Sequence, residues 1–512
     1  MTDTVLRDSG NGKRVTPSRE RQAGPAAGGP EGPDNDERVA SRREQRAEPL
    51  YIGRIKVYPR KVRGTMRRLK TAMLLLLLAV YYAAPWLRWD RGPGAPDQAL
   101  LIDLPGRRGY FLWVEIWPQE VYYLTGILVL AALGLFLATS LFGRVWCGFT
   151  CPQTVWTDLF MWVERAIEGD RNARMRLDKQ PLSVDKAARK IAKHGAWLVI
   201  ALLTGGAWAM YFTDAPTLVR EFFTGQASLT VYFFVGLFTF TTYLLAGWAR
   251  EQVCTYMCPW PRIQGAMLDE DSLNVTYRTW RGEPRGKHKA GTSWEGHGDC
   301  VDCFSCVAVC PTGIDIRDGA QLECIGCGLC IDACNEVMTK VGRPQGLIAF
   351  DSARNLALQS AGQPRVPWKP IRLRTIVYVA LLLLVAAGVV AALGTRSTLD
   401  INVLPERTPL FVLLKDGSIQ NAYTLKILNK QRLAREFTLT VASPANARIE
   451  IVGAEPDGTL AAKPDHVATY RVLVSLPRAE VKDERQDLTF VLTDKAGDDS
   501  ARHRTVFRGP HS

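Results

Sequence analysis

Twelve cysteines carry most of the chemistry that this 512-residue chain can do. Eight of them fall into two runs with the spacing CxxCxxCxxxC: Cys300, Cys303, Cys306 and Cys310, then Cys324, Cys327, Cys330 and Cys334. A compact loop with a thiolate at every third residue can bind three corners of an iron-sulfur cube. The fourth corner must then come from elsewhere in the chain.

The spacing predicts two 4Fe-4S clusters of the kind found in two-cluster bacterial ferredoxins, where the last cysteine of each run ligates the other cluster. The first cluster is expected on Cys300, Cys303, Cys306 and Cys334, and the second on Cys324, Cys327, Cys330 and Cys310. Zinc is the alternative, but structural zinc sites favour two separated cysteine pairs. Asn335 stands where such runs usually have proline, which alters the turn but removes no ligand.

The remaining four cysteines form two CxxxCP motifs, Cys147 with Cys151 and Cys254 with Cys258. Each pair follows an apolar stretch and an arginine, so the two copies look like a repeat. The proline after each pair disfavours helix at the cysteine before it, which predicts a helix end or break there. Broken backbone at membrane depth is tolerated where it lines a protein-enclosed cavity.

If the two breaks meet, four thiolates come together. Such a set suits Cu(I), zinc or a third iron-sulfur centre, and Met257 could add a thioether ligand. Copper is attractive because thiolates favour its reduced ion and an electron store would lie nearby. The alternative is that these are small buried cysteines at helix ends, since free cysteine is often buried.

Five stretches contain no Asp, Glu, Lys or Arg and approach or exceed the roughly 20 apolar residues that a membrane-spanning helix needs. They are Thr71–Leu87, Val121–Phe142, Gly195–Thr213, Ala227–Ala249 and Thr375–Thr395. We therefore expect a multi-pass membrane protein. The segment Arg54–Lys70 carries eight basic and no acidic residues, so it should stay in the cytoplasm and contact anionic membrane lipid.

If successive loops alternate between the two sides of the membrane, starting from this cytoplasmic end, both CxxxCP motifs and the cysteine runs lie in the cytoplasm. Everything after Thr395 then lies in the periplasm. No cysteine lies in a segment expected outside, so a disulfide framework is not expected. The net charge of +13 is explained mostly by topology, and no nucleic-acid partner is predicted.

The expected fold is a multi-domain membrane protein with an α-helical transmembrane bundle of five spans, a two-cluster ferredoxin insert and an all-β Ig-like sandwich. The expected domains are a disordered tail (1–48), a four-helix membrane domain with both CxxxCP motifs (49–270), a cytoplasmic ferredoxin-like domain (271–370), a fifth span (371–396) and a periplasmic sandwich (397–512). The last segment alternates β-rich stretches with turn residues, which predicts about seven strands. It contains neither cysteine nor tryptophan.

The motifs WCGFTCPQTVWTDLF (146–160) and CTYMCPWPRIQGAML (254–268), with the doubled cysteine runs and a sandwich tail, resemble the CcoG/FixG family from about residue 50 onward. Its members are cytochrome c oxidase accessory proteins, which are membrane polyferredoxins that aid assembly of the cbb-type oxidase. The family is associated with the reduction of Cu(II) to Cu(I) for the oxidase's copper centre.

The resemblance implies an electron-transfer oxidoreductase, expected to be a cupric reductase. Its partners would be the cbb-type oxidase or its copper-delivery factors and an unidentified cytoplasmic electron donor. The eight run cysteines carry over as cluster ligands, and Cys147, Cys151, Cys254 and Cys258 as copper or electron-relay residues. Two other hypotheses stay open: a quinol-linked electron conduit of a respiratory chain, and a non-catalytic assembly scaffold.

Overall fold

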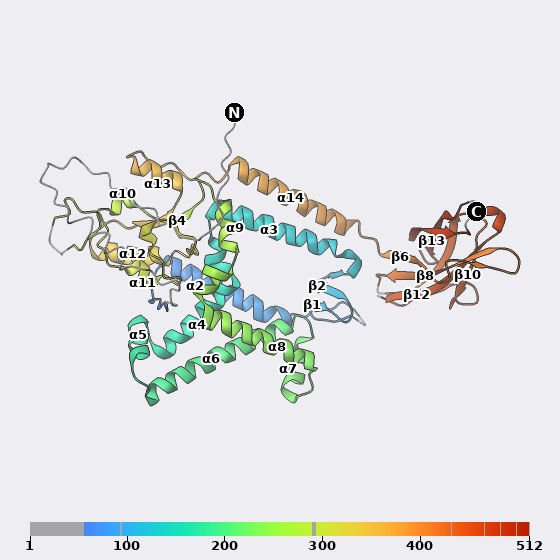
Figure 1. Ribbon diagram of the computed structural model, residues 1–512, viewed down its shortest axis with the longest axis horizontal. Coiled ribbons are helices and arrows are strands. Elements are labelled where there is room, and N and C mark those ends of the chain that lie inside the picture. Colours follow the sequence, from blue (N-terminus) through green and yellow to red (C-terminus); the bar gives the residue numbers. More distant parts are fainter. Residues whose placement is uncertain are drawn as a thin grey trace, which may run out of the picture. The chain divides into compact units, whose positions relative to one another are not determined.

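The computed structural model describes residues 56–510 except 93–94, 289–292, 432, 465, 482 and 498. The predicted disordered tail (1–48) lies outside the described residues. Outside the cysteine-rich insert the α-helices are α2 (Thr65–Ala83), α3 (Tyr122–Phe142), α4 (Pro152–Glu168), α5 (Arg171–Lys179), α6 (Val184–Ala209), α7 (Ala215–Thr224), α8 (Leu229–Thr242), α9 (Trp260–Met267) and α14 (Leu373–Gly394). Figure 1 shows their arrangement.

Four helices in the described part of the chain are long and apolar enough to cross a membrane. They cover Thr65–Trp86, Pro118–Phe142, Leu229–Ala249 and Leu373–Gly394, and they correspond to four of the five expected spans. In the most apolar stretch of α14, no residue is buried against the rest of the protein. Such a continuous apolar surface is unfavourable in water and matches a hydrocarbon surrounding.

The fifth expected span, Gly195–Thr213, lies in α6 and the turn after it, and α6 is not one of these four helices. Its N-terminal half carries charges, Lys193 among them, so only the C-terminal half is apolar. The helix nevertheless runs antiparallel beside α8. A Cβ on Gly205 would lie 2.8 Å from the Val235 carbonyl oxygen, and one on Gly247 would lie 3.1 Å from the Trp197 ring.

Helices α3 and α14 form a second antiparallel pair (Figure 1). The Tyr123 hydroxyl donates to the Ala392 carbonyl at 2.8 Å near one end, and the rings of Phe136 and Tyr378 lie 6.3 Å apart toward the other. Helix α2 instead packs on α6, where the hydroxyl of Tyr81 donates to the carbonyl of Thr204 at 2.8 Å.

A short antiparallel sheet that the sequence analysis did not predict lies between α2 and α3. Its strands are β1 (Leu100–Asp103), β2 (Arg108–Phe111) and β3 (Val114–Ile116), paired in that order. Each strand has only three or four residues, which is too short to leave a clear alternation in the sequence. The buried Arg91 guanidinium binds four backbone carbonyls of this region, those of Pro96, Gln98, Ala99 and Leu112.

The cysteine-rich insert is built on a two-stranded antiparallel sheet of β4 (Asn274–Tyr277) and β5 (Ile348–Asp351). Its helices are α10 (Thr279–Gly282), α11 (Ser305–Val309), α12 (Leu329–Lys340) and α13 (Ala353–Ser360). Helices α11 and α12 each begin inside a cysteine run, so the third cysteine of each run lies in the first turn of a helix. The cysteines pack among aliphatic side chains and form part of the insert's core.

The C-terminal domain is a sandwich of two antiparallel sheets, as predicted. One sheet has the order β10-β12-β8-β6, with β7 paired to β8, and the other has the order β11-β9-β13-β14. The strands are β6 (Leu399–Pro405), β7 (Val412–Leu413), β8 (Ile419–Asn429), β9 (Arg435–Ser443), β10 (Arg448–Val452), β11 (Leu460–Ala462), β12 (His466–Leu476), β13 (Arg485–Asp494) and β14 (Ser500–Arg508). The expectation of about seven strands was too low, because short strands such as β7 and β11 were missed.

The core of the sandwich is aliphatic and aromatic. Tyr423 and Phe490, from the two sheets, pack edge to face with ring centroids 5.5 Å apart. Arg435 and Asp494 form a buried ion pair beside this core.

Candidate iron-sulfur and cysteine-motif site

One hollow in the insert is lined by four cysteines from both runs: Cys300, Cys303, Cys306 and Cys334. The first three lie in the loop before α11 and in its first turn, whereas Cys334 comes from α12. Most of the remaining lining is apolar, with the rings of Tyr277 and Phe304, and it also includes the polar residues Ser305 and Arg317. Cys303 is exposed, so this hollow approaches the protein surface.

A second hollow is lined by Cys310, Cys324, Cys327 and Cys330, and also by Cys306, which lines the first hollow as well. Cys310 ends α11 and so belongs to the first run, while the other three belong to the second. Apart from the shared Cys306, the hollows divide the cysteines in the way that the ligand sets predicted from the run spacing require, and the assignment of ligands to clusters stays a prediction. Cys327 is buried and Cys310, Cys324 and Cys330 are partly buried, so none of these four is exposed as Cys303 is.

Both hollows fit a 4Fe-4S cluster by the chemistry of their donors. Each offers four soft sulfur donors within an otherwise mainly apolar wall, which is what an iron-sulfur cube requires. Burial raises the pKa of Cys306 to about 11 and of Cys334 to about 12, with neighbouring thiolates adding to the shift for Cys334. Thiols in such places are inert unless a metal takes the proton's place.

Backbone geometry lets the second run wrap its hollow closely. Gly326 has φ of +69°, a left-handed conformation that side chains rarely adopt, and a Cβ there would also lie 3.2 Å from the Arg144 carbonyl oxygen. The guanidinium of Arg144 in turn donates to the Leu322 carbonyl just before this run. The loop of the second run is thus packed directly on the segment that leads into the first CxxxCP motif.

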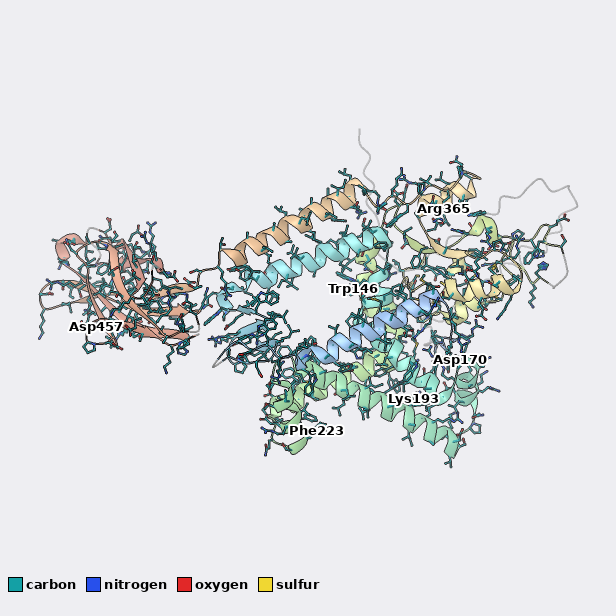
Figure 2. The ribbon with its side chains drawn as sticks, turned by 180° about the vertical axis from the view of Figure 1, so that it is seen from behind. Trp146, Asp170, Lys193, Phe223, Arg365 and Asp457 are labelled. Atoms are coloured by element: carbon teal, nitrogen blue, oxygen red, sulfur yellow. The ribbon has the colours of Figure 1, made fainter. Side chains whose placement is uncertain are left out.

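The two CxxxCP motifs break the helices as predicted. Cys147 and Cys254 lie in short π-helical turns, Trp146–Thr150 and Val253–Met257, and each second cysteine takes an extended conformation before its proline. The ψ angles of Cys151 and Cys258 are 128° and 122°. Single π-helical turns occur frequently at functional sites. Trp146 marks the first motif in Figure 2.

The four motif cysteines are neighbours. Burial and, after it, the neighbouring thiolates of Cys151, Cys147 and Cys258 together raise the pKa of Cys254 to about 12. Cys254 also packs against the buried cluster that contains Cys147. The Cys147 thiol donates to the side-chain oxygen of Gln264 on α9 at 3.0 Å. The repeat therefore folds back on itself, and the two motifs meet.

The predicted copper ligands do not form one compact metal site. Among the described residues no group of three or more His, Cys, Asp or Glu side chains is close enough to hold a single metal ion, and this holds for the eight run cysteines as well as for the motif cysteines. Met257 is 64% exposed, and Cys258 is exposed as well. A role for these residues in holding copper remains a prediction.

The first motif touches the second hollow through backbone. A Cβ on Gly148 would lie 2.9 Å from the Ile325 carbonyl oxygen and 3.0 Å from the Cα of Cys327. Both neighbours are main-chain atoms that cannot swing aside, so only glycine fits at this position. Cys147, next to Gly148, shares one buried cluster with Cys327. The cysteine-lined hollow and the CxxxCP motif are therefore in direct contact.

A buried ion-pair network lies beside the second motif. Glu164 on α4 pairs with Arg174 at 2.7 Å, Arg250 at 3.0 Å and Lys193 at 3.5 Å. Burial alone would raise the pKa of Glu164, but the surrounding cations outweigh it and hold the pKa below the usual carboxyl value. Lys193, labelled in Figure 2, also bonds Glu168 at 2.9 Å. Arg250 is thus fixed just before Cys254.

Sequence reasoning missed Gly148, Gln264 and the carboxylate of Asp332. The first two touch Cys327 and Cys147 only because segments distant in the chain fold together. Asp332 on α12 accepts bonds from the backbone N–H groups of Met66 and Arg67 at 3.2 and 2.7 Å, so the insert caps the first turn of α2. The only related sequence signal is the arginine before each motif, Arg144 and Arg250, and the sequence alone predicts no role for either.

Comparisons with known proteins agree with this architecture. A profile described as a 4Fe-4S dicluster domain matches residues 249–353, and one described as a 4Fe-4S binding domain matches residues 124–168. A third, described as an IG-like fold at the C-terminal of FixG, matches residues 389–510. The match at 124–168 contains only Cys147 and Cys151, so a complete four-cysteine site cannot lie within it.

Three curated relatives are similar over most of their length. "Nitrogen fixation protein FixG" of Rhizobium meliloti is 48% identical over 491 residues, covering 90% of this chain and 93% of the relative. "Protein RdxB" of Cereibacter sphaeroides is 49% identical over 467 residues, covering 90% and 97%. "Protein RdxA" of the same organism is 50% identical over 409 residues, covering 80% and 86%.

The apolar helices, the cysteine-lined hollows and the matching profiles define a membrane protein that transfers electrons through 4Fe-4S centres. Within that class, the chain belongs to the FixG family, also called the CcoG/FixG family. The resemblance drawn from the cysteine motifs is thereby confirmed.

Proposed function

We propose that this protein passes single electrons from a cytoplasmic donor through its ferredoxin insert to the CxxxCP cysteines, where Cu(II) is reduced to Cu(I). The observation that carries the proposal is the backbone contact between Gly148 and the Cys327 loop. It supports a continuous path from the second cysteine-lined hollow into the first motif.

Different cysteines have different roles along this electron path. Cys300, Cys303, Cys306 and Cys334 would hold one 4Fe-4S cluster, and Cys310, Cys324, Cys327 and Cys330 the other. One-electron transfer is the chemistry that such clusters would supply when bound. Cys303 is exposed, which suits electron uptake from a soluble donor, whereas the hollow around Cys327 adjoins the first motif and suits electron release.

Copper acts here as substrate, not as a resident cofactor. One electron leaves the reduced protein and converts one Cu(II) to Cu(I), and no proton is taken up or released. Soft thiolates stabilise Cu(I) over Cu(II), which favours reduction at a cysteine-rich place. The exposed Cys258 and Met257 offer sulfur atoms that a copper ion can reach from outside the protein. The Cu(I) product would go to a cbb-type oxidase or its copper-delivery factors.

The proposed topology has five spans, with the insert in the cytoplasm and the sandwich in the periplasm. Its support is the antiparallel packing of α6 on α8, because a helix beside a span traverses the same depth. The meeting of the two CxxxCP motifs supports it too, since both must then lie at the same membrane face. A membrane-impermeant thiol reagent should label Cys258, which is exposed and assigned to neither cluster, in inside-out vesicles and leave intact spheroplasts unlabelled.

The test uses full-length protein purified without oxygen and reduced with dithionite. Adding Cu(II) should reoxidise the clusters, with one Cu(I) trapped by bathocuproine for each electron lost. Gly148→Ala should slow this reoxidation by about tenfold or more, because the new methyl group displaces the Cys327 loop from the motif. Gly206→Ala is the matched control, since a Cβ there meets nothing within 4 Å.

Equal rates in both glycine variants would refute the proposed path. A reduced protein that Cu(II) does not oxidise, but a quinone does, would favour the quinol-linked conduit instead. An oxidase that assembles fully with a cluster-free variant would favour the scaffold.

A further inference from the structure

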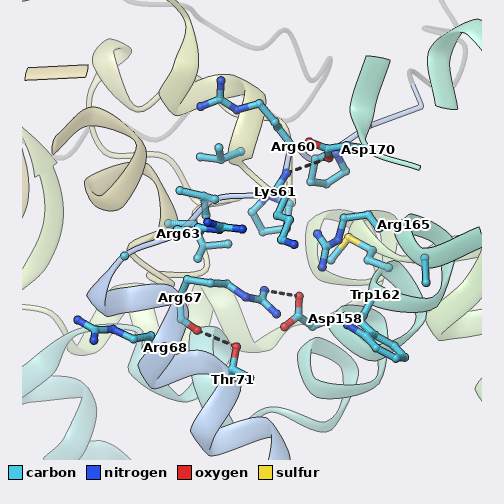
Figure 3. A pocket seen from close by; sticks show the side chains of 18 of the residues that line it. Arg60, Lys61, Arg63, Arg67, Arg68, Thr71, Asp158, Trp162, Arg165 and Asp170 are labelled. Atoms are coloured by element: carbon cyan, nitrogen blue, oxygen red, sulfur yellow. Dashed lines mark hydrogen bonds and ion pairs between the residues drawn. The ribbon is translucent and has the colours of Figure 1, made fainter. Parts of the chain in front are cut away.

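A large pocket lies where α2 begins, outside the cysteine site. Its volume is about 1180 Å³. It is lined by the segment before α2, the first turns of α2, one face of α4 and two edges of the insert (Figure 3). The charged residues in its lining are Arg60, Lys61, Arg63, Arg67, Arg68 and Arg165 on the basic side and Asp158 and Asp170 on the acidic side.

The positive charges in this pocket exceed the negative ones. Asp158 is fully buried and pairs with Arg67 at 2.9 Å, and Asp170 accepts a bond from the backbone N–H of Lys61 at 3.0 Å. In the described part of the chain, the side chains of Lys61, Arg63 and Arg165 make no ion pair within 4.0 Å. Figure 3 shows these three pointing toward the middle of the pocket from two different segments.

Of the three cations, Arg165 has the least favourable electrostatic surroundings. It lies on α4, partly buried, and burial lowers the pKa of its guanidinium despite the nearby Asp158 and Asp170 carboxylates, while Arg67 and Arg174 repel it. An arginine does not lose its proton in proteins. A partly buried cation without a partner is unfavourable, so an anion from outside the chain would stabilise it.

The pocket has an apolar side as well. Leu75 on α2 and Trp162 on α4 line it with 61% and 60% of their surfaces exposed. From Gly64 to Leu75 the helix rises about 16 Å at 1.5 Å per residue. Because α2 is a candidate span, the pocket extends from the water boundary into the depth that acyl chains occupy.

We propose that this pocket binds one anionic phospholipid, with its phosphodiester headgroup among Lys61, Arg63 and Arg165 and an acyl chain against Leu75 and Trp162. The unpaired cations identify a phosphate-bearing ligand, and the adjoining apolar wall identifies a lipid rather than free phosphate. The segment before α2, helix α4 and the insert all line the pocket, so the bound lipid would hold them together. The proposal depends on membrane insertion but not on copper reduction.

The experiment is native mass spectrometry of the full-length protein released from detergent. Phosphatidylglycerol, phosphatidylcholine of the same acyl chains, and inorganic phosphate are added in separate titrations. The test variant replaces Lys61, Arg63 and Arg165 together by glutamine. The matched control replaces Arg176, Lys179 and Arg189 together by glutamine, which removes three exposed cations of α5 and α6 outside the pocket. Cluster absorbance is recorded for each protein.

Wild type and control should retain one phosphatidylglycerol that the test variant binds about a hundredfold more weakly, since each of the three lost cations contributes roughly a fivefold factor near a membrane surface. Phosphatidylcholine should bind wild type no better than it binds the variant. If Arg165→Gln perturbs the fold, Lys61→Gln with Arg63→Gln keeps the test, since both side chains are exposed.

Equal retention of phosphatidylglycerol by test variant and control would overturn the proposal. So would equal binding of phosphatidylcholine and phosphatidylglycerol by wild type, or tighter binding of inorganic phosphate than of the lipid. If the reduced wild-type protein does not reduce Cu(II) but binds phosphatidylglycerol as expected, the proposed function is contradicted and the lipid site is not.

Discussion

At the scale of single residues, the exchange of one cysteine between the two runs is the feature most open to test. Cys334 belongs to the second run by position but lines the hollow of the first, and Cys310 does the reverse. Cysteine variants should therefore group by hollow and not by run.

Cys334→Ser should lose the same cluster as Cys300→Ser, because both remove a ligand from one cube. Each single variant should retain about four of about eight iron atoms. The double variant Cys334→Ser with Cys300→Ser should retain the same number, because both changes affect one cluster. Cys334→Ser combined with Cys324→Ser should lose nearly all iron. Iron analysis with EPR of the reduced protein gives the answer, and a Cys334→Ser, Cys324→Ser double variant that keeps about four iron atoms would contradict the assignment.

At the scale of elements, the insert and the first span are joined by a helix cap. The N-cap position of α2 is Gly64, which has no side chain, and the Asp332 carboxylate from α12 takes that role. A carboxylate at a helix N-terminus also interacts favourably with the helix dipole.

Asp332→Ala should destabilise the junction by about 1 kcal/mol, the usual cost of losing an N-cap. The insert should then be cleaved faster by a protease under native conditions. Asp185→Ala is the control, because that carboxylate is exposed and forms only an i,i+4 pair on α6. Equal cleavage rates for the two variants would mean that the cap contributes nothing to the junction.

The network around Glu164 gives a prediction about pH. The pKa of Glu164 is lowered in the folded protein, so its stabilising effect is complete above the unfolded value near 4.5 and is lost as pH falls through the folded pKa. Glu164→Gln should cost about 3–5 kcal/mol at neutral pH, because the buried cations Arg174 and Arg250 lose their carboxylate partner, while Lys193 keeps Glu168. The difference in thermal stability between wild type and variant should shrink below about pH 4.5. A constant difference from neutral pH down to about pH 3 would exclude the network as its cause.

Local patterns explain what could be predicted. The cysteine sets follow from spacing within short runs, and the breaks at Cys151 and Cys258 follow from the next residue being proline. The contact of Gly148 with Cys327 and the cap by Asp332 could not be predicted, because each joins segments far apart in the chain. Helix α6 was predicted from its apolar half alone, and its charged half belongs to the ion-pair network instead.

At the scale of the whole molecule, the insert and the sandwich have separate cores of different kinds. The buried clusters of the insert include Cys300, Cys306 and Cys334 among aliphatic residues, whereas the sandwich core is wholly aliphatic and aromatic. A core that contains metal-binding thiols depends on the metal for part of its stability.

Removing iron with a chelator and an oxidant should therefore unfold the insert and spare the sandwich. Limited proteolysis followed by mass spectrometry should show new cleavage within residues 271–370, while a fragment covering the strands from β6 to β14 persists. Simultaneous loss of both regions would show that they share one cooperative unit.

The sandwich holds its two sheets together without a disulfide, through a core in which Tyr423 of one sheet packs on Phe490 of the other. Its maturation accordingly needs no thiol oxidase, and a mutant cell without that machinery should still accumulate it in full. A domain without sulfhydryl groups also cannot be crosslinked through disulfides by stray oxidants, nor can it bind soft metal ions through a thiolate.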